Sequence, residues 1–212
     1  IIYCNWKGLS DAENATEGNC DLDLYVSSDS KLEFINILSK KGFIVVSSFQ
    51  AKHEFIEHFY GLDVDTGIFA HIHVYFRLVT GESFSKNYVL PLENFIESRI
   101  DNNNFISKVN PEASMAIFLI RFFIKIGSIY GLLQFFRDKH KYDREWEYIN
   151  CKQRVVAVPE LKLSEEFIKD MYKIFISQRL LPKLFMSIIF KNKINAFKKR
   201  GFLRHQFFKG IT

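Results

Sequence analysis

Two carboxylates stand one residue apart in an apolar run, at Asp21 and Asp23 of the segment from Gly18 to Val26. The run is typical of a β-strand, on which side chains two residues apart point to the same face. We expect both carboxylates to project together, and their mutual repulsion needs a compensating cation. Mg²⁺ takes one or two carboxylates together with substrate phosphate oxygens, so the pair is a candidate magnesium site. The alternative is a solvated turn acid followed by an acid on an edge strand.

Two histidines alternate along the most strand-like run of the sequence, which extends from Phe69 to Val79. By the same period of two, His71 and His73 share one face of that strand. Imidazole is a poor ligand for Mg²⁺, but it acts as a general base or binds Mn²⁺. The alternative is a pair of polar residues on a half-exposed strand. No Cys/His spacing in the sequence is typical of a zinc site.

The elements that must position these residues are strands combined with one early helix. Hydrophobic periodicity predicts strands over 1–6, 21–26, 43–49 and 69–79, and a helix from about 31 to 41. Residues 7–19 are polar and are predicted to form a loop, while 61–67 are predicted to form a turn between paired strands. Residues 53–60 fit a strand or a short helix equally well. This order favours a mixed sheet with a helix packed on it.

The pattern becomes helical after an Asn-rich stretch near residue 101. We therefore predict an α+β domain over 1–100 and an all-helical domain over 101–212, with further helices over 161–178 and 184–199. Residues 115–136 are long and apolar enough to span a bilayer, but Arg121 and Lys125 interrupt them. Charges are costly in lipid, so a buried helix pair is the favoured interpretation. The two cations then need buried acids or a bound anion as partners, and we expect an ion pair.

Composition bounds the class of protein. The 212 residues are 48% hydrophobic and 25% charged, which excludes a disordered chain and allows one large domain or two small ones. The three cysteines are irregularly spaced, which argues against a disulfide framework and fits a reducing cytoplasm. Because the sequence begins inside an apolar run without Met, we expect it to be a fragment.

Basic residues gather at the end of the chain, where Lys and Arg but no Asp or Glu follow Asp170. In 183–212 they alternate with Phe and Leu. This mixture suits an anionic membrane surface, where each basic residue adds roughly 1 kcal/mol. It equally suits packing against a missing part of a longer protein. Single-stranded nucleic acid is the least favoured partner, since no RNA- or DNA-binding motif is present. We expect a cytoplasmic protein, peripheral at the membrane if the tail binds lipid.

A succession of short motifs carries a family resemblance: Asn5-Trp6-Lys7, the Asp-x-Asp strand at 21–26, Gly42-Phe43, Asp65-Thr66-Gly67, the strand at 71–79, Gly81-Glu82 and Lys86-Asn87-Tyr88-Val89-Leu90-Pro91. It resembles the nucleotidyltransferase superfamily of polymerase-β-like fold, and more specifically the uncharacterised nucleotidyltransferase-like proteins of bacteria. Some of those accompany polysaccharide gene clusters, and some are fused to a kinase-like domain. The resemblance covers most of residues 1–100. The helical part resembles the helical partner domain of such proteins only in its general layout.

The resemblance implies a small mixed-sheet nucleotidyltransferase-like domain with a cleft against the helical domain. Asp21 and Asp23 would hold Mg²⁺, or Mn²⁺, while the α-phosphate of an NTP, expected to be ATP, is attacked by an acceptor hydroxyl. The acceptor would be a small molecule or glycan-related. Lys7, Arg77 and Lys86 are candidates to contact triphosphate oxygens, and the alternative is that these basic strand and loop residues are solvated. Clustered carboxylates with a cation supply the charge neutralisation on which phosphoryl and nucleotidyl transfer rely.

Two departures from the family pattern open an alternative. The usual Gly-Ser pair is replaced by Gly8 and Ser10, which Leu9 separates. The third carboxylate, expected on a neighbouring strand, is replaced by the two histidines, with Asp63 and Asp65 as nearby substitutes in a turn. The alternative function is a catalytically inactive, nucleotidyltransferase-like interaction module of a longer protein.

Overall fold

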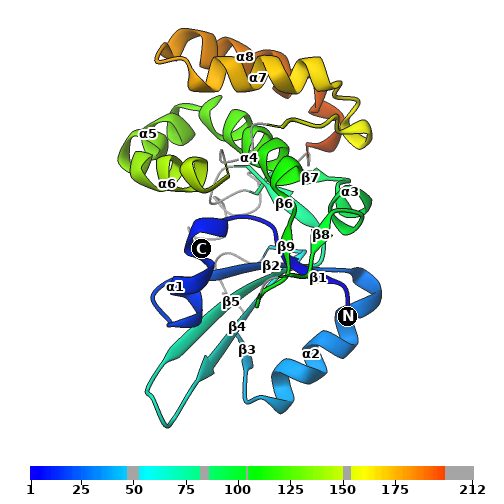
Figure 1. The fold of residues 1–212 in the computed structure, drawn as a ribbon, viewed down its shortest axis with the longest axis vertical. Helices are drawn as coiled ribbons and strands as arrows, with labels where there is room; N and C mark the ends of the chain where they lie inside the picture. Colours follow the sequence, from blue (N-terminus) through cyan, green and yellow to red (C-terminus); the bar gives the residue numbers. More distant parts are fainter. Residues whose placement is uncertain (47–52, 82–85, 104, 150–153, 199–212) are drawn as a thin grey trace, which may run out of the picture.

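The computed structural model describes residues 1–46, 53–81, 86–103, 105–149 and 154–198 and has a mixed α+β architecture (Figure 1). Its strands are β1 Tyr3–Asn5, β2 Leu22–Val26, β3 Ile44–Val46, β4 Ile56–Leu62, β5 Phe69–Tyr75, β6 Leu78–Thr80, β7 Tyr88–Leu90, β8 Ile100–Asp101 and β9 Lys108–Val109. Its α-helices are α1 Ala12–Thr16, α2 Lys31–Lys40, α3 Glu93–Glu97, α4 Pro111–Ile126, α5 Ile129–Arg137, α6 Lys139–Ile149, α7 Glu165–Ile176 and α8 Leu180–Lys193. Short 3₁₀ turns are η1 Leu9–Asp11, η2 Ser28–Ser30, η4 Pro159–Leu161 and η5 Asn195–Phe197.

The described strands form a mixed seven-stranded sheet and a separate pair. The sheet has the order β3-β4-β5-β2-β1-β9-β8, and β6 pairs with β7. β2 pairs in parallel with β5, and β1 in parallel with β9, whereas the other neighbours are antiparallel. The ambiguous segment 53–60 contributes most of strand β4. The predicted turn at 61–67 closes the β4–β5 hairpin, where Asp63 N donates to Ile68 O over 2.9 Å.

The two faces of the sheet carry different cores. On one face, Leu24 and Val26 of β2 pack with Phe34 of α2 and with residues of β4 and β5. On the other face, Tyr25 and Tyr75 belong to the larger core that includes α4. Figure 1 shows α2 and helices α4–α6 on opposite sides of the sheet. Since side chains alternate along a strand, the face that carries Tyr25 is also the face of Asp23 and looks toward the helical half.

Two local predictions were wrong. The polar segment 7–19 is not a plain loop, since η1 and the five-residue helix α1 lie within it. The strand predicted over 69–79 ends at Tyr75, because its partner β4 begins at Ile56 and gives no further ladder. The chain then turns, and Leu78–Thr80 pairs with Tyr88–Leu90 in the separate pair. The histidines therefore lie on β5, and Arg77 falls in the turn after it.

The helical half begins at a well-formed cap. Asn110 Oδ1 accepts from Ala113 N over 3.0 Å, and Pro111 occupies the first turn, where its missing N–H costs nothing.

Strand pairing carries the sheet to Val109, so the division predicted near residue 101 falls inside β8. Helices α7 and α8 occupy most of the two later predicted helical segments. The described parts of 43–49 and 184–199 end at residues 46 and 198, so their remainders and residues 199–212 of the basic tail lie outside the described residues.

The long apolar segment forms α4 and α5 as two separate helices. α4 is buried along most of its length. In the described part of the chain, no single helix is long and apolar enough to cross a membrane. Length and composition alone would allow it only for α4 and α5 together, as a pair bent by 119°.

Candidate functional site

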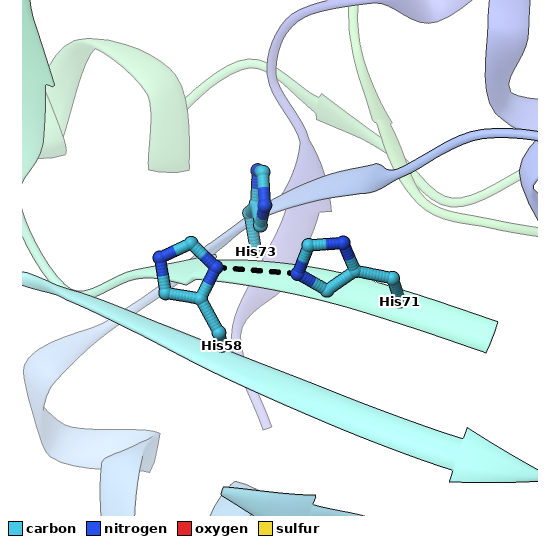
Figure 2. Close-up of side chains that lie close together, drawn as sticks. All are labelled: His58, His71 and His73. Atoms are coloured by element: carbon cyan, nitrogen blue, oxygen red, sulfur yellow. Dashed lines mark hydrogen bonds between the residues drawn. The ribbon is translucent and has the colours of Figure 1, made fainter. Parts of the chain in front are cut away.

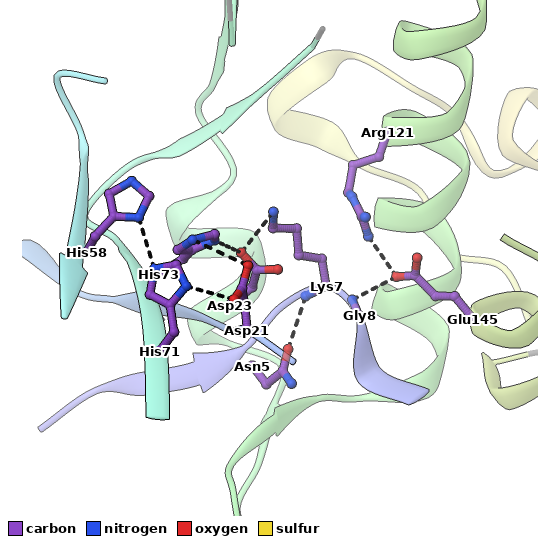
Figure 3. Close-up of polar contacts among 10 residues, drawn as sticks. All are labelled: Asn5, Lys7, Gly8, Asp21, Asp23, His58, His71, His73, Arg121 and Glu145. Atoms are coloured by element: carbon purple, nitrogen blue, oxygen red, sulfur yellow. Dashed lines mark hydrogen bonds and ion pairs between the residues drawn. The ribbon is translucent and has the colours of Figure 1, made fainter. Parts of the chain in front are cut away.

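Three neighbouring strands bring two carboxylates and three imidazoles together on the face that looks toward the helices. Strand register places Asp23 opposite His73, and His58 opposite the same His73. His71 Nδ1 lies 2.7 Å from Asp21 Oδ1, and His73 Nδ1 lies 3.3 Å from Asp23 Oδ1. Figure 3 shows these side chains converging from β2, β4 and β5. The four residues proposed from the sequence thus lie together, and His58 joins them.

A lysine from the loop after β1 completes the inner side of the pair. Lys7 Nζ lies 2.9 Å from Asp23 Oδ1, and both side chains are largely buried. Burial alone would raise the pKa of the Asp23 carboxyl, but the charge of Lys7 and the hydrogen bond to His73 hold it well below its usual range. Asp21, by contrast, exposes 50% of its side chain. The pair therefore has one inner carboxylate already matched by a cation and one outer carboxylate open to solvent.

Two of the imidazoles, those of His58 and His71, are linked by a hydrogen bond (Figure 2). His58 Nδ1 lies 3.2 Å from His71 Nε2. Burial lowers the pKa of His58 to about 4, and the charges of His73 and His71 act in the same direction. Burial also lowers the pKa of His71, although Asp21 opposes this. A carboxylate only accepts, so His71 Nδ1–H donates to Asp21, which leaves Nε2 as the acceptor for His58.

A second group of charges faces the pair from the helical half. Arg121 of α4 lies 2.7 Å from Glu145 Oε1 of α6, and the same oxygen accepts from Gly8 N over 3.0 Å (Figure 3). This confirms the expected ion pair for Arg121. Lys125, one turn further along α4, has no ion pair with a described residue and lies 5.8 Å from the ring centre of Tyr142. Burial, then the charges of Arg121 and Lys7, lower its pKa to about 7.

Lys86 approaches the same region from the segment before β7. Burial lowers the pKa of Lys86 well below its usual value, and the charges of Lys7 and Lys125 lower it further, while Asp23 opposes them. Within the ranges that the structure describes, Lys86 likewise forms no ion pair. The buried side chains of Lys86 and Lys125 therefore lie near Asp23, and neither forms an ion pair with a described residue.

The other predicted residues lie apart from this cluster. Arg77 Nε lies 3.4 Å from Glu93 Oε1, and its guanidinium stacks over Phe55. The Asp63 carboxylate accepts from Thr66 Oγ1 and Asp65 N inside the exposed hairpin turn. Neither turn acid contacts the pair, so they do not replace the third carboxylate.

A surface cavity of about 670 Å³ also lies away from the site. It is lined by residues that include Arg99, Arg154 and Tyr172, and none of the site residues borders it. Trp146 packs against Phe118 and Phe175 in the core.

His58, Lys125 and Glu145 did not enter the predicted site. The signal for His58 was present, because the hairpin turn at 61–67 fixes the register that places 58 opposite 73. The sequence identified Lys125 as a cation in an apolar segment, but it did not predict that the charge of Asp23 would act on it. Glu145 carried no signal, since its partner belongs to a different helix.

The donor atoms around Asp21 and Asp23 are of two kinds, and they differ in how well they suit Mg²⁺. Two carboxylates from one strand supply the oxygen atoms that this ion prefers, and the half-exposed Asp21 is reachable from solvent. The neighbouring donors are imidazole nitrogens, which suit Mn²⁺ or Zn²⁺ better than Mg²⁺. The pair fits a magnesium ion that takes its remaining ligands from water and a substrate.

Comparisons with known proteins add no relative: no family model matches the chain, and neither a curated protein nor a solved structure matches it.

Proposed function

We propose that the protein is a metal-dependent nucleotidyltransferase that moves a nucleoside monophosphate from an NTP, ATP in the first instance, to a small-molecule or glycan-related acceptor. The proposal includes the assignment of the α+β part as a nucleotidyltransferase-like domain followed by a helical domain. It rests on the family resemblance of the motifs in residues 1–100 and on one observation. Lys86 and Lys125 are buried, form no ion pair with a described residue, and lie close enough to Asp23 for its charge to act on their pKa values.

The charge balance is what favours a phosphate ligand. Among the described residues, Lys7 pairs with Asp23 and Arg121 with Glu145, whereas Lys86 and Lys125 form no ion pair. An unmatched buried charge costs several kcal/mol, and the lowered pKa values of both lysines express that cost. A polyphosphate bound at the carboxylate pair would supply the missing negative charge. Charge-assisted hydrogen bonds from ammonium groups to phosphate oxygens are among the stronger ones in proteins.

The roles of the residues follow from their positions. Asp21 and Asp23 would hold Mg²⁺, which supplies charge neutralisation and orientation at the α-phosphate. Lys7 keeps Asp23 ionised, and the Arg121–Glu145 pair fixes the loop after β1 through Gly8. His71 and His73 lie next to the carboxylates and are the candidate general bases.

The test is NTP binding by variants of the carboxylate pair. Asp21→Asn and Asp23→Asn should each abolish the part of ATP affinity that depends on Mg²⁺. Asp65→Asn in the exposed hairpin turn is the matched control and should bind as the unmodified protein does. Calorimetric titration with ATP, with and without Mg²⁺, measures this. Equal affinities in all four proteins would contradict the proposal.

A second candidate function is a catalytically inactive binding module. It is favoured by one observation: the residue opposite Asp23 on β5 is His73, and Asp23 is already matched by Lys7. Pyrophosphate release separates the two functions. The enzyme should release pyrophosphate from ATP when supplied with a pool of hydroxyl acceptors, whereas the module should bind ATP without any release.

A further inference from the structure

We infer that His58, His71 and His73 form a binding site for one divalent transition-metal ion, Zn²⁺ by its chemistry, with Asp21 and Asp23 orienting the imidazoles from outside the coordination shell. The inference does not depend on nucleotidyl transfer. It concerns a different set of ligands from the carboxylate oxygens proposed to hold Mg²⁺.

The distances suit a small ion. One ligand nitrogen from each of the three rings lies within 4.8 Å of the other two. Nitrogens bound at 2.0–2.1 Å in a tetrahedron around Zn²⁺ are about 3.3 Å apart. His58 Nδ1 and His71 Nε2 already stand 3.2 Å apart (Figure 2), so mainly the ring of His73 has to move, while the Nδ1 proton of His58 shifts to its Nε2.

The strands hold the three rings on one face. His58 and His73 are directly opposed in the antiparallel β4–β5 ladder, and His71 lies two residues before His73 on the same strand. Tyr60 stacks on the ring of His71 with centroids 4.1 Å apart and planes 11° apart. Ligands carried by paired strands need little ordering when a metal binds, which favours affinity.

The carboxylates fix which nitrogens are free. Metal-bound histidines commonly donate their other ring N–H to a carboxylate, which sets the tautomer and strengthens the ligand. Asp21 accepts from His71 Nδ1 at 2.7 Å, so His71 Nε2 is the nitrogen left for a metal. Asp23 Oδ1 lies 3.3 Å from His73 Nδ1, but Asp21 Oδ2 lies 3.6 Å from His73 Nε2, so the ring of His73 has to turn away from Asp21 before Nε2 can bind a metal. In this arrangement the carboxylates act through the rings and leave an open coordination position for water.

The donor type selects the ion. Three neutral imidazoles are a set that suits Zn²⁺, Ni²⁺ or Cu²⁺ and is poor for Mg²⁺. The side chains of His71 and His73 are 18% and 20% exposed, so each retains a small contact with solvent. No zinc-like spacing is visible in the sequence because the third ligand comes from another strand. With a metal bound, His71 and His73 are ligands and no longer general bases.

The experiment is metal titration of the full chain after chelator treatment. Co²⁺ serves as the spectroscopic probe, because low-coordinate Co²⁺ absorbs visible light, and Zn²⁺ competition against a chelating dye gives the affinity. We expect one equivalent of each ion and no displacement by excess Mg²⁺. His58→Ala and His73→Ala should weaken binding by about 100-fold or more, and Asp21→Asn by about 10- to 100-fold.

His140→Ala, on the exposed surface of α6, is the control and should bind as the unmodified protein does. His58→Gln, with a far-UV spectrum and melting curve for each variant, separates loss of a ligand from loss of the fold. Wild-type protein that takes up no stoichiometric Zn²⁺ or Co²⁺ would overturn the inference. So would binding unaffected by a folded His58 variant, or displaced by Mg²⁺, which would place the ion on the carboxylates. Mg²⁺-dependent ATP binding that survives in His58→Ala would keep the proposed function separate from this result.

Discussion

Replacing Lys125 with methionine tests whether an unmatched ammonium group destabilises the fold. Its pKa is lowered from 10.5 to about 7 by burial and by the charges of Arg121 and Lys7. At about 1.4 kcal/mol per pK unit, this lowering corresponds to ~5 kcal/mol. Because the side chain keeps partial exposure to solvent, we expect about half of this, ~2 kcal/mol, in a stability measurement.

The sign of the pH dependence follows from the two pKa values. Between about 7 in the folded state and 10.5 in the unfolded state, the unfolded chain binds more protons at Lys125. The cost of this group is therefore fully present below pH 7 and falls as pH rises toward 10.5. Lys125→Met removes the group, so the variant should be the more stable protein near neutral and acid pH, with the difference shrinking in alkali.

Urea denaturation at three pH values between about 6 and 9 measures this difference in the free energy of unfolding. Lys40→Met, at the exposed end of α2, is the control and should follow the unmodified protein at every pH. A stability difference that does not change with pH, or a Lys125→Met protein that is less stable at the acid end, would refute the reasoning.

Three further substitutions test the packing around the site by denaturation. Glu145→Gln should cost about 3–5 kcal/mol, because it leaves the guanidinium of its partner on α4 buried and unmatched, whereas the exposed Glu166→Gln should be neutral. Asn110→Ala should cost about 1 kcal/mol by removing the side-chain cap of α4, and an unchanged melting temperature would contradict that role. Phe122→Ala should cost about 3–5 kcal/mol by opening a cavity among the aromatic rings of the core, against no measurable change for Phe105→Ala, which is 93% exposed.

The period of two along a strand was enough to predict which faces the candidate residues share. It placed Asp21 with Asp23, and His71 with His73, before any strand pairing was known. It did not predict that the two pairs would meet, because the parallel register of β2 with β5 depends on how α2 and the β4–β5 hairpin return the chain to the sheet.

Other features depended on contacts that no local pattern encodes. Helix α1 has only five residues, too few for periodicity or propensity to identify, and it is held by packing against its neighbours. β5 ends at Tyr75, opposite Ile56, the first residue of β4, so the length of β5 is set by its partner strand. Arg121 finds its carboxylate on another helix, at Glu145. The apolar segment around Arg121 did predict that such a partner was needed.

The central claim is that Lys86 and Lys125 bind the phosphates of a nucleotide beside Asp21 and Asp23. Calorimetric titration of ATP with Mg²⁺ at about pH 8, in buffers of different ionisation enthalpy, tests it most directly. Phosphate binding should raise the pKa of Lys125 from about 7, so the protein should take up protons on binding, and Lys125→Met should reduce that uptake. ATP binding without proton uptake, or the same uptake in the variant, would contradict the account.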